Sequence, residues 1–266
     1  MGTIISFVSI KGGVGKTTMA LETASALAND FGKKVLLVDA NFSAPNIGLY
    51  LDLKNDLTIH DVLSDNEGLH AAIYEAYGMD IVPASMYFND AIDPLKLKKV
   101  LEKYRNRYDF IIIDSSPHHS EMLPAIAAAD KIFVVTTPDR VTLHTSMKAA
   151  QLAKKNKTNV EGVIINKIKD SKYELDLSEI EGLIELPVLA RVKDHKKIIE
   201  AGHFKVPITI YDGVNEISKE IKRLASAIAG HKEKESFFSK LLGRHFKTEK
   251  VNREMYRQKF YEAQMI

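Results

Sequence analysis

The chain has 266 residues, 45% of them hydrophobic and 27% charged, which is the composition of a globular protein with one large domain. It contains no cysteine, and this excludes disulfides, cysteine-ligated zinc and cysteine-held iron–sulfur clusters. No signal peptide precedes the first apolar run, and no apolar run approaches the about 20 residues that span a bilayer. We therefore expect a cytoplasmic protein.

The charge is distributed unevenly along the chain. The net charge is +2, from 37 Lys and Arg against 35 Asp and Glu. From His231 to the end there are nine Lys and Arg against five Asp and Glu, so this segment carries +4 and the remainder −2. The composition changes near Gly230, a residue type that commonly ends a helix. We therefore divide the chain into a body, residues 1–230, and a basic tail, residues 231–266.

Seven short apolar runs alternate with helix-length amphipathic segments along the body. The runs cover residues 3–9, 34–40, 79–85, 108–116, 130–138, 160–168 and 186–192. Continuous runs rich in Ile and Val are typical of strands buried on both faces, and the long connections favour right-handed βαβ units. The pattern predicts an α/β fold with a mostly parallel central sheet flanked by helices. Ligands of such sheets bind beyond the carboxyl ends of the strands.

The first connection, SIKGGVGKTTMA at residues 9–20, lies between a predicted strand and a predicted helix. Gly15, Lys16 and Thr17 match the G-x-x-x-x-G-K-[ST] phosphate loop, although Ile10 replaces its first glycine. Lys16 would reach the β- and γ-phosphates, and Thr17 would ligate Mg²⁺. Backbone N–H groups and the helix N-terminus would bind further phosphate oxygens. The nucleotide-binding residues predicted in this loop are Gly12, Gly13, Val14, Gly15, Lys16, Thr17 and Thr18.

A second lysine in the same loop, Lys11, narrows this interpretation. The segment KGGVGKTT resembles the deviant Walker loop of the MinD/ParA family, P-loop ATPases of the SIMIBI class that position proteins, plasmids and other cargo. The resemblance covers about residues 3–229. It implies a homodimer in the ATP state, in which Lys11 contacts the phosphates bound to the other subunit. Taken without the resemblance, the alternative interpretation of Lys11 is a solvated loop lysine.

The second apolar run leads into VDANFSAPNIGLYL, residues 38–51, which resembles switch I of the family. Asp39 matches an aspartate near Mg²⁺. Asn41 stands where the family has a second aspartate that orients or deprotonates the attacking water. An amide can hydrogen-bond a water but cannot take its proton, so we expect slow hydrolysis. The candidate catalytic residues are Lys11, Lys16, Asp39 and Asn41.

The segment FIIIDSSP, residues 110–117, resembles Walker B leading into switch II. A carboxylate at the end of a buried strand can hold Mg²⁺ through water, so Asp114 joins Thr17 and Asp39 as a predicted magnesium residue. His118 and His119 follow, but neighbouring side chains in an extended loop diverge and no third ligand is close in sequence. We interpret the two histidines as solvated switch residues and not as a metal site.

Two later loops are predicted to contact the nucleotide base. Asn166 lies near the end of the sixth run, where the family has an asparagine that hydrogen-bonds adenine. Lys193 and Asp194 lie where the family's next loop packs over the base, although the usual Ile-Pro pair is absent. For these two residues a base contact and an ordinary surface loop are both open. The resemblance implies ATP or ADP and Mg²⁺ as cofactors.

The tail contains EKESFFSKLLGRHFK, residues 233–247, with basic residues outside an apolar stripe. The stripe has the spacing of one helical face and consists of Phe237, Phe238, Leu241, Leu242 and Phe246. A basic amphipathic helix over 236–247 can bind an anionic membrane, as a similar short helix of MinD proteins does. The chain then continues for about twenty residues, and this extension also fits docking on the body or on a partner. The body's negative charge disfavours nucleic acid.

The leading hypothesis is a Mg²⁺-dependent ATPase that dimerises around ATP in the manner of MinD. It would position a partner or cargo, peripherally at the inner face of the cell membrane. A ParA-like partition ATPase that binds DNA non-specifically is a second hypothesis. An ATP-binding adaptor with little hydrolysis is a third, and Asn41 is the residue that suggests it. The cargo and any activating protein are not identified by the sequence.

Overall fold

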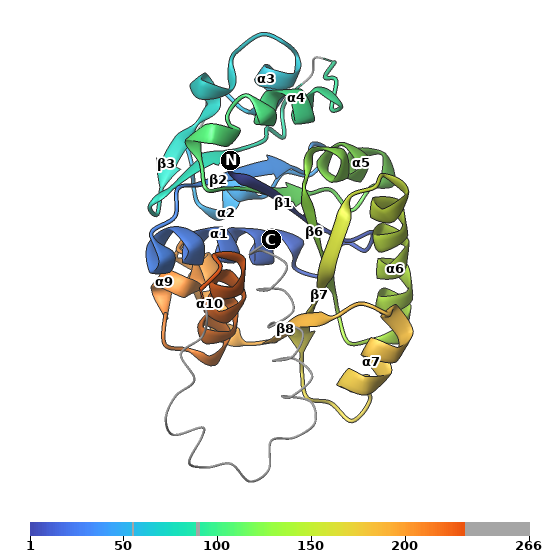
Figure 1. The fold of residues 1–266 in the computed structure, drawn as a ribbon. Helices are drawn as coiled ribbons and strands as arrows, with labels where there is room; N and C mark the ends of the chain where they lie inside the picture. The colour runs from blue at the N-terminus through green and yellow to red at the C-terminus, as the bar shows by residue number, and fades with distance from the viewer. Residues whose placement is uncertain (55, 89–90, 232–266) are drawn as a thin grey trace.

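The computed structural model describes residues 1–54, 56–88 and 91–231. The described residues contain one eight-stranded sheet in the order β3-β4-β2-β5-β1-β6-β7-β8 (Figure 1). All neighbouring pairs are parallel except β3–β4. The strands are β1 (Thr3–Val8), β2 (Val35–Ala40), β3 (Tyr74–Ala76), β4 (Met79–Val82), β5 (Phe110–Ser115), β6 (Lys131–Thr136), β7 (Asn159–Ile168) and β8 (Val188–Lys193). The predicted mostly parallel sheet is confirmed.

The seven predicted runs correspond to β1, β2 and β4 to β8, and β3 is the strand that the sequence did not predict. It is three residues long, includes the exposed Glu75, and pairs antiparallel with β4 at the edge of the sheet. An edge strand has one side chain row and one backbone edge open to solvent, so it needs no apolar run. The signal on which the prediction rested is therefore absent from this strand.

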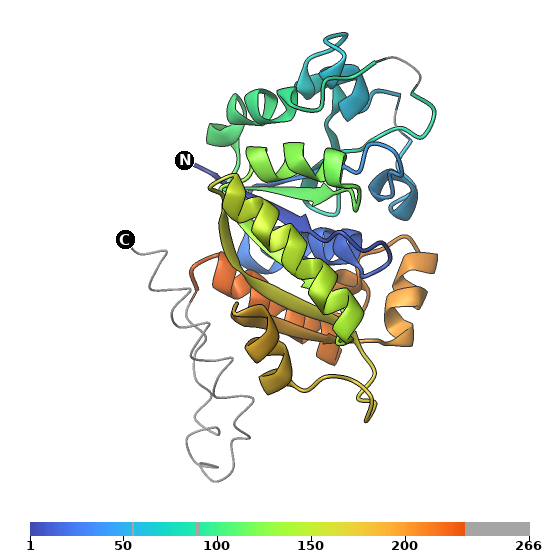
Figure 2. The same cartoon turned by 90° about the vertical axis from the view of Figure 1, so that its right-hand side faces the viewer.

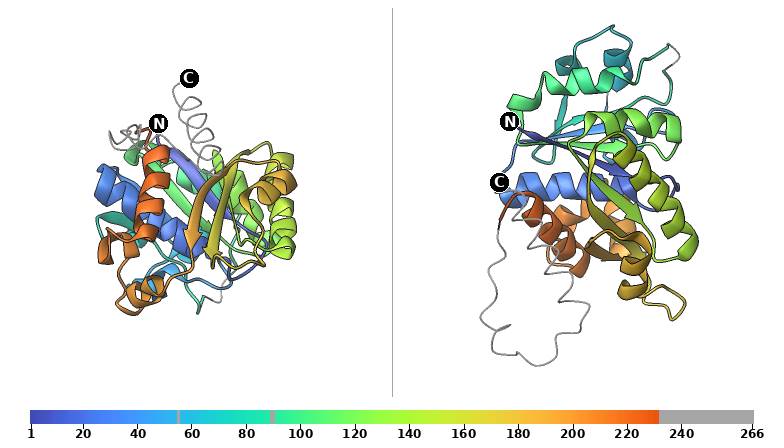
Figure 3. Two further views of the ribbon diagram at one scale, coloured as in Figure 1. Left: turned by 90° about the horizontal axis from the view of Figure 1, so that it is seen from below. Right: turned by 45° about the vertical axis from the view of Figure 1, so that its right-hand side comes forward.

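Helices cover both faces of the sheet (Figures 1 and 3). The helices α1 and α10 pack on one face, and α3 to α7 pack on the other. The α-helices are α1 (Lys16–Phe31), α2 (Ile47–Tyr50), α3 (Ile59–Leu63), α4 (Lys96–Glu102), α5 (His119–Ala128), α6 (Arg140–Lys155), α7 (Leu177–Ile184), α8 (Lys196–His203), α9 (Ile208–Tyr211) and α10 (Glu216–Ile228). Two short 3₁₀ helices are η1 (Leu69–Ala72) and η2 (Arg105–Arg107).

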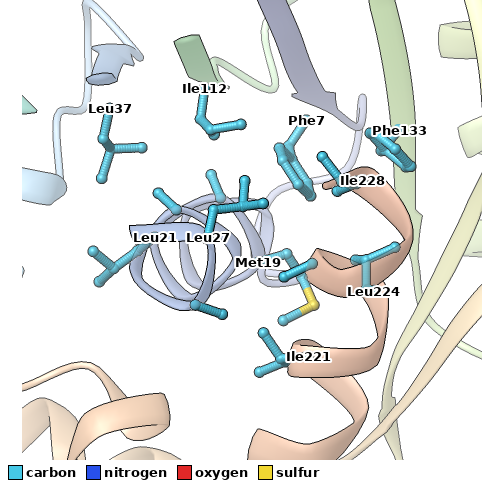
Figure 4. Packing of buried hydrophobic residues seen from close by; sticks show 14 of the residues in the cluster. Phe7, Met19, Leu21, Leu27, Leu37, Ile112, Phe133, Ile221, Leu224 and Ile228 are labelled. Atoms are coloured by element: carbon cyan, nitrogen blue, oxygen red, sulfur yellow. The ribbon is translucent and has the colours of Figure 1, made fainter. Parts of the chain in front are cut away.

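Helix α1 is enclosed between the sheet and α10, and ten of its 16 residues are buried. Figure 4 shows Met19 of α1 beside Ile221 and Leu224 of α10. On the sheet side, Phe7 and Phe133 stack with their ring centroids 5.5 Å apart. Each apolar side chain buried in this way contributes about 1.5–3 kcal/mol. The packing fixes α1, which begins directly after the loop that follows β1, against the sheet.

The C-terminal part of the described chain ends as the sequence predicts. The helix before Gly230 is α10, and Asn215 caps its start by accepting a hydrogen bond from the Ile217 N–H, 2.9 Å away. Gly230 has φ 72°, a backbone conformation that favours glycine. The predicted membrane helix, 236–247, lies outside the described residues. Among the described helices, none combines the length and the apolar character needed to cross a bilayer.

Candidate nucleotide site

The loop between β1 and α1 has the backbone of a phosphate cradle. Gly13 and Gly15 have φ of 77° and 95°, backbone angles that residues other than glycine adopt only with strain. A Cβ on Gly15 would also lie 2.1 Å from Asn166 Nδ2, whereas Gly12 and Gly13 face open space. Val14 is buried in the core and anchors the loop from below. In Figure 2 this loop and the N-terminus, where β1 begins, lie on opposite sides of the molecule.

Lys16 is the first residue of α1, and its side chain is almost completely buried. Burial lowers the pKa of Lys16, and the nearby Asp114 charge acts in the opposite direction. The next residue, Thr17, donates a hydrogen bond from Oγ1 to Asp114 Oδ2 over 2.6 Å. An ammonium, a hydroxyl and a carboxylate are thus placed together at the N-terminus of α1, the end of a helix that favours bound anions.

Asp39 and Asp114 end neighbouring strands and are paired in register between β2 and β5. Both carboxyls are fully buried. Burial raises the pKa of Asp114 to about 8, and the negative charge of the adjacent Asp39 is the second cause of this rise. Burial also raises the pKa of Asp39 to about 6, although three backbone N–H groups stabilise its charged form. Two buried carboxyls side by side repel each other when ionised, and a bound cation would relieve that repulsion.

The donors around Asp114 fit Mg²⁺. Asp114 Oδ1 is buried and has no hydrogen-bond partner among the described residues, and Thr17 supplies a hydroxyl oxygen beside it. Hydroxyl and carboxylate oxygens, completed by water and nucleotide phosphates, are the ligands that Mg²⁺ uses in such sites. The described residues include no cluster of three His, Asp or Glu that could hold a metal ion. His118 and His119 are exposed, as expected for solvated residues.

Asp39 also organises the loop that follows β2. Its Oδ2 accepts hydrogen bonds from the Asn46 and Ile47 N–H groups, both at 3.0 Å, where α2 begins. Its Oδ1 accepts a bond from the Asn41 N–H at 3.1 Å. This carboxylate therefore joins residues 41 and 46–47 within the segment predicted to be switch I. A change in what Asp39 binds would reach α2 directly.

Asn41 lies next to Asp39, and its side chain is buried. Its Nδ2 donates to the Ala44 carbonyl oxygen, while its Oδ1 is buried and accepts no bond from the described residues. The amide is thus oriented by the loop itself, with its acceptor oxygen left over. That oxygen can accept a hydrogen bond from a water but cannot take up a proton near neutral pH.

Lys11 lies on the exposed part of the loop and contacts a residue far along the chain. Its Nζ donates to Thr142 Oγ1 over 2.6 Å. Thr142 is fully buried in the first turn of α6, which Asp139 caps by accepting from the Thr142 N–H at 2.9 Å. Sequence reasoning missed Thr142, and the P-D-R-x-T pattern before α6 indicates only the helix cap.

The three predicted base-contacting residues lie along the ends of β7 and β8. Asn166 is buried, and its Nδ2 donates to the Val14 carbonyl at 2.8 Å, so it is tied to the phosphate loop. Lys193 is paired in register with Ile168 of β7, and its Nζ lies 2.9 Å from Asp170 Oδ2. Asp194 forms an ion pair with Lys169, 3.7 Å away. The structure brings Asn166 to the phosphate loop. The side chains of Lys193 and Asp194 instead pair with Asp170 and Lys169, the two residues that follow β7.

A parallel sheet with a glycine-rich loop leading from β1 to the buried lysine of α1 defines a P-loop nucleotide-binding protein. A protein-family model described as an AAA domain matches residues 2–161. An uncharacterised ATP-binding protein of Methanocaldococcus jannaschii is 32% identical over 91% of this chain and 96% of its own length. The septum site-determining protein MinD of Thermotoga maritima is 31% identical over 86% of this chain and 89% of its own length. The chain belongs to the MinD/ParA family of P-loop ATPases.

Two solved structures agree with this assignment. The cell division ATPase MinD of Pyrococcus furiosus is 30% identical and superposes with a TM-score of 0.80 over 86% of this chain and 98% of that one. The septum site-determining protein MinD of Pyrococcus horikoshii, complexed with Mg-ADP, is 29% identical with the same TM-score, over 86% and 96% of the two chains. Each match covers 86% of this chain and leaves 14% of it outside the similarity.

Proposed function

We propose that this chain is a Mg²⁺-dependent ATPase that works as a dimerisation switch of the MinD type. ATP would bring two copies together, and its hydrolysis to ADP and phosphate would separate them. The observation that carries this proposal is the grouping of Lys16, Thr17 and Asp114 at the N-terminus of α1, with the Lys11 loop directly before it. The Mg-ADP complex of the P. horikoshii relative supports it.

In this proposal each residue of the site has a separate task. Lys16 would neutralise the β- and γ-phosphates, and the burial of its side chain strengthens that attraction because the charges interact away from bulk water. Thr17 and Asp114 would hold Mg²⁺, with Asp39 beside them. The metal ion, when bound, supplies positive charge to the phosphate oxygens. Asn166 would accept and donate hydrogen bonds at the adenine edge.

Lys11 and Asn41 set how fast the switch would run. Lys11 would contact the phosphates of the other subunit and stabilise the charge that develops there during hydrolysis. Asn41 would hold the attacking water through its free Oδ1, without acting as a general base. Hydrolysis should therefore be slow in the isolated protein. An activating partner or a cargo could supply what Asn41 does not.

ATP turnover tests the enzymatic part of the proposal. The purified full-length chain should release phosphate from ATP in Mg²⁺ and not in EDTA. Lys16→Ala should abolish turnover, because the buried ammonium is removed from the phosphates. Lys98→Ala is the matched control, since Lys98 is an exposed lysine of α4 far from the loop in the sequence. Equal rates in the two variants would contradict the assignment of the site.

The tail would recruit the ATP dimer to an anionic membrane surface. A single helix over 236–247 would bind weakly, because helices below about 12–15 residues are marginal alone in water. Two tails on one dimer make the second insertion intramolecular, which can add about 10²–10⁴ in avidity. Co-sedimentation with phosphatidylglycerol vesicles should therefore require ATP, and Phe238→Glu or truncation after Gly230 should abolish it. Recruitment that is equal with ATP and ADP would exclude this part of the proposal.

A second candidate function is an ATP-binding adaptor that hardly hydrolyses its nucleotide. The internal bond between Asn41 and Ala44 favours it, because the loop is built around an amide at the position of the water-activating carboxylate. Under this alternative the wild-type chain would bind ATP tightly and dimerise, but phosphate release would stay at the rate of the Lys16→Ala variant. The turnover measurement therefore separates the two functions.

A further inference from the structure

Lys11 and Thr142 form a contact that spans 131 positions of one chain. The 2.6 Å bond joins the Lys11 ammonium to a hydroxyl that is otherwise buried in the first turn of α6. Lys11 itself is exposed. The ammonium of an exposed lysine is normally surrounded by water. The short hydrogen bond to Thr142 therefore means that the Lys11 side chain takes one defined position.

The surroundings of the contact both attract and repel the lysine. The N-terminus of α6 carries the positive end of the helix dipole, which disfavours a cation. The Asp139 carboxylate at the helix cap offsets that effect: burial alone would raise its pKa, but hydrogen bonds from Thr137 and Thr142 and the nearby Lys11 charge keep the pKa of Asp139 below its ordinary value. The attraction of Lys11 to the N-terminus of α6 is therefore weaker than its attraction to nucleotide phosphates, which carry several negative charges.

We propose that Thr142 is a positioning residue, a latch that holds Lys11 within its own subunit until the ATP dimer forms. The proposal rests on the proposed role of Lys11 at the phosphates of the other subunit. A lysine cannot donate to Thr142 and reach across an interface with the same extended side chain, so dimerisation has to break the Thr142 bond. The latch would raise the threshold for dimerisation and keep nucleotide-free or partly loaded subunits apart.

Two substitutions isolate the Thr142 hydroxyl. Thr142→Val keeps the branched shape that fills the buried position but removes the acceptor, and it leaves Lys11 free in solvent. Thr142→Ser keeps the acceptor and is the matched control. A hydrogen bond from a charged donor is strong enough to shift an equilibrium by roughly 10- to 100-fold. Since breaking it is part of dimerisation, its prior removal should favour the dimer.

The first measurement is the dimer dissociation constant of the full-length chain with Mg²⁺ and a non-hydrolysable ATP analogue. We expect Thr142→Val to lower this constant about tenfold, Thr142→Ser to leave it near the wild-type value, and the valine effect to vanish in a Lys11→Ala background. An unchanged or higher dissociation constant in Thr142→Val would overturn the latch, and a higher one would mean that Thr142 presents Lys11 to the partner.

The second measurement does not depend on dimerisation. In the nucleotide-free protein, the rate at which acetic anhydride modifies Lys11, followed by mass spectrometry, should rise in Thr142→Val and not in Thr142→Ser, while the rate at Lys98 stays constant. Equal Lys11 rates in all three proteins would show that the contact does not hold the lysine, whatever the dimer does. If Lys11 is released by the valine but the wild type never dimerises, the proposed dimerisation switch fails, and the latch fails with it as a regulator.

Discussion

Asp39 and Asp114 lie opposite each other at the ends of β2 and β5, both fully buried, and only Asp114 has an oxygen without a hydrogen-bond partner among the described residues. The two carboxyls are therefore not equivalent. Asp39 is engaged by three backbone N–H groups of the following loop, whereas Asp114 binds Thr17 and has a free acceptor. Under the proposed function, Asp114 would hold the metal ion, and Asp39 would transmit its presence to α2 through the bonds to Asn46 and Ile47.

The first prediction follows from this difference. Asp114→Asn removes the carboxylate that would face Mg²⁺ while keeping an acceptor for Thr17. ATP affinity in Mg²⁺ should therefore fall about ten- to a hundredfold, the usual range for residues in the outer shell of a metal site. Affinity in EDTA should change little. Calorimetric titration of ATP in both buffers measures the two values, with Asp109→Asn, an exposed carboxyl, as the control. An equal loss in both buffers would mean that the variant damages the loop and not a metal site.

The second prediction concerns Lys11. Lys11→Ala should bind ATP normally, because Lys16 and the backbone of the loop remain, but it should lose ATP hydrolysis. Fluorescent-nucleotide binding and phosphate release measure the two properties on the same preparation. Thr142→Val serves as the comparison, since it breaks the same hydrogen bond but keeps the lysine. If both variants lose hydrolysis equally, Lys11 acts through its contact with α6 and not across an interface.

The third prediction concerns Asn41. Asn41→Asp restores a proton acceptor next to the reacting water, and general-base catalysis contributes about 10²–10⁴-fold. The gain should be smaller than that range, because the substitution also turns the Nδ2 donor to Ala44 into an oxygen facing that carbonyl. Single-turnover hydrolysis is the measurement, and Asn41→Ala is the control for loss of the amide. A rate below wild type in Asn41→Asp would show that the loop requires the amide.

The fourth prediction uses a carboxyl outside the nucleotide site. Glu22 of α1 is buried and accepts bonds from the Ile208 and Thr209 N–H groups at the start of α9, 2.7 and 3.1 Å away. Burial raises the pKa of Glu22 to about 7, against the opposing effect of these bonds. The folded protein then binds more protons than the unfolded chain between the ordinary pKa and 7. Its stability from this group is full at low pH and is lost as pH rises towards 7.

The expected size is about 3 kcal/mol of unfolding free energy between pH 4.5 and 7.5, at 1.36 kcal/mol per pKa unit. Urea unfolding of wild type and Glu22→Gln across this range isolates the contribution, because a glutamine does not titrate. The difference between the two proteins should change steadily with pH, with wild type relatively more stable at the acidic end. A difference that is independent of pH would show that Glu22 is ionised in the folded protein throughout.

The sequence predicted most of the fold because its signals are local. Each buried strand corresponds to an apolar run in the sequence, and the phosphate loop and its lysine are contiguous in the chain. Asp39 and Asp114 were predicted as magnesium residues separately. Their direct opposition depends on the register of β2 against β5, which no single segment encodes.

The contacts that the sequence did not predict are between distant side chains. Thr142 is one of several polar residues in an amphipathic helix, and nothing in its neighbourhood points to Lys11. Glu22 has the sequence context of an ordinary polar helix position, and its burial results from α9 packing across α1. Pairings of this kind depend on how elements meet in space, so the sequence alone gives no signal for them.

Nucleotide-dependent dimerisation tests the central claim most directly. Light scattering of the wild-type chain should give the mass of one 29.8 kDa chain with Mg-ADP, and twice that mass with Mg²⁺ and a non-hydrolysable ATP analogue. A chain that binds the analogue but keeps one mass in both nucleotide states, either monomer or dimer throughout, would contradict the switch.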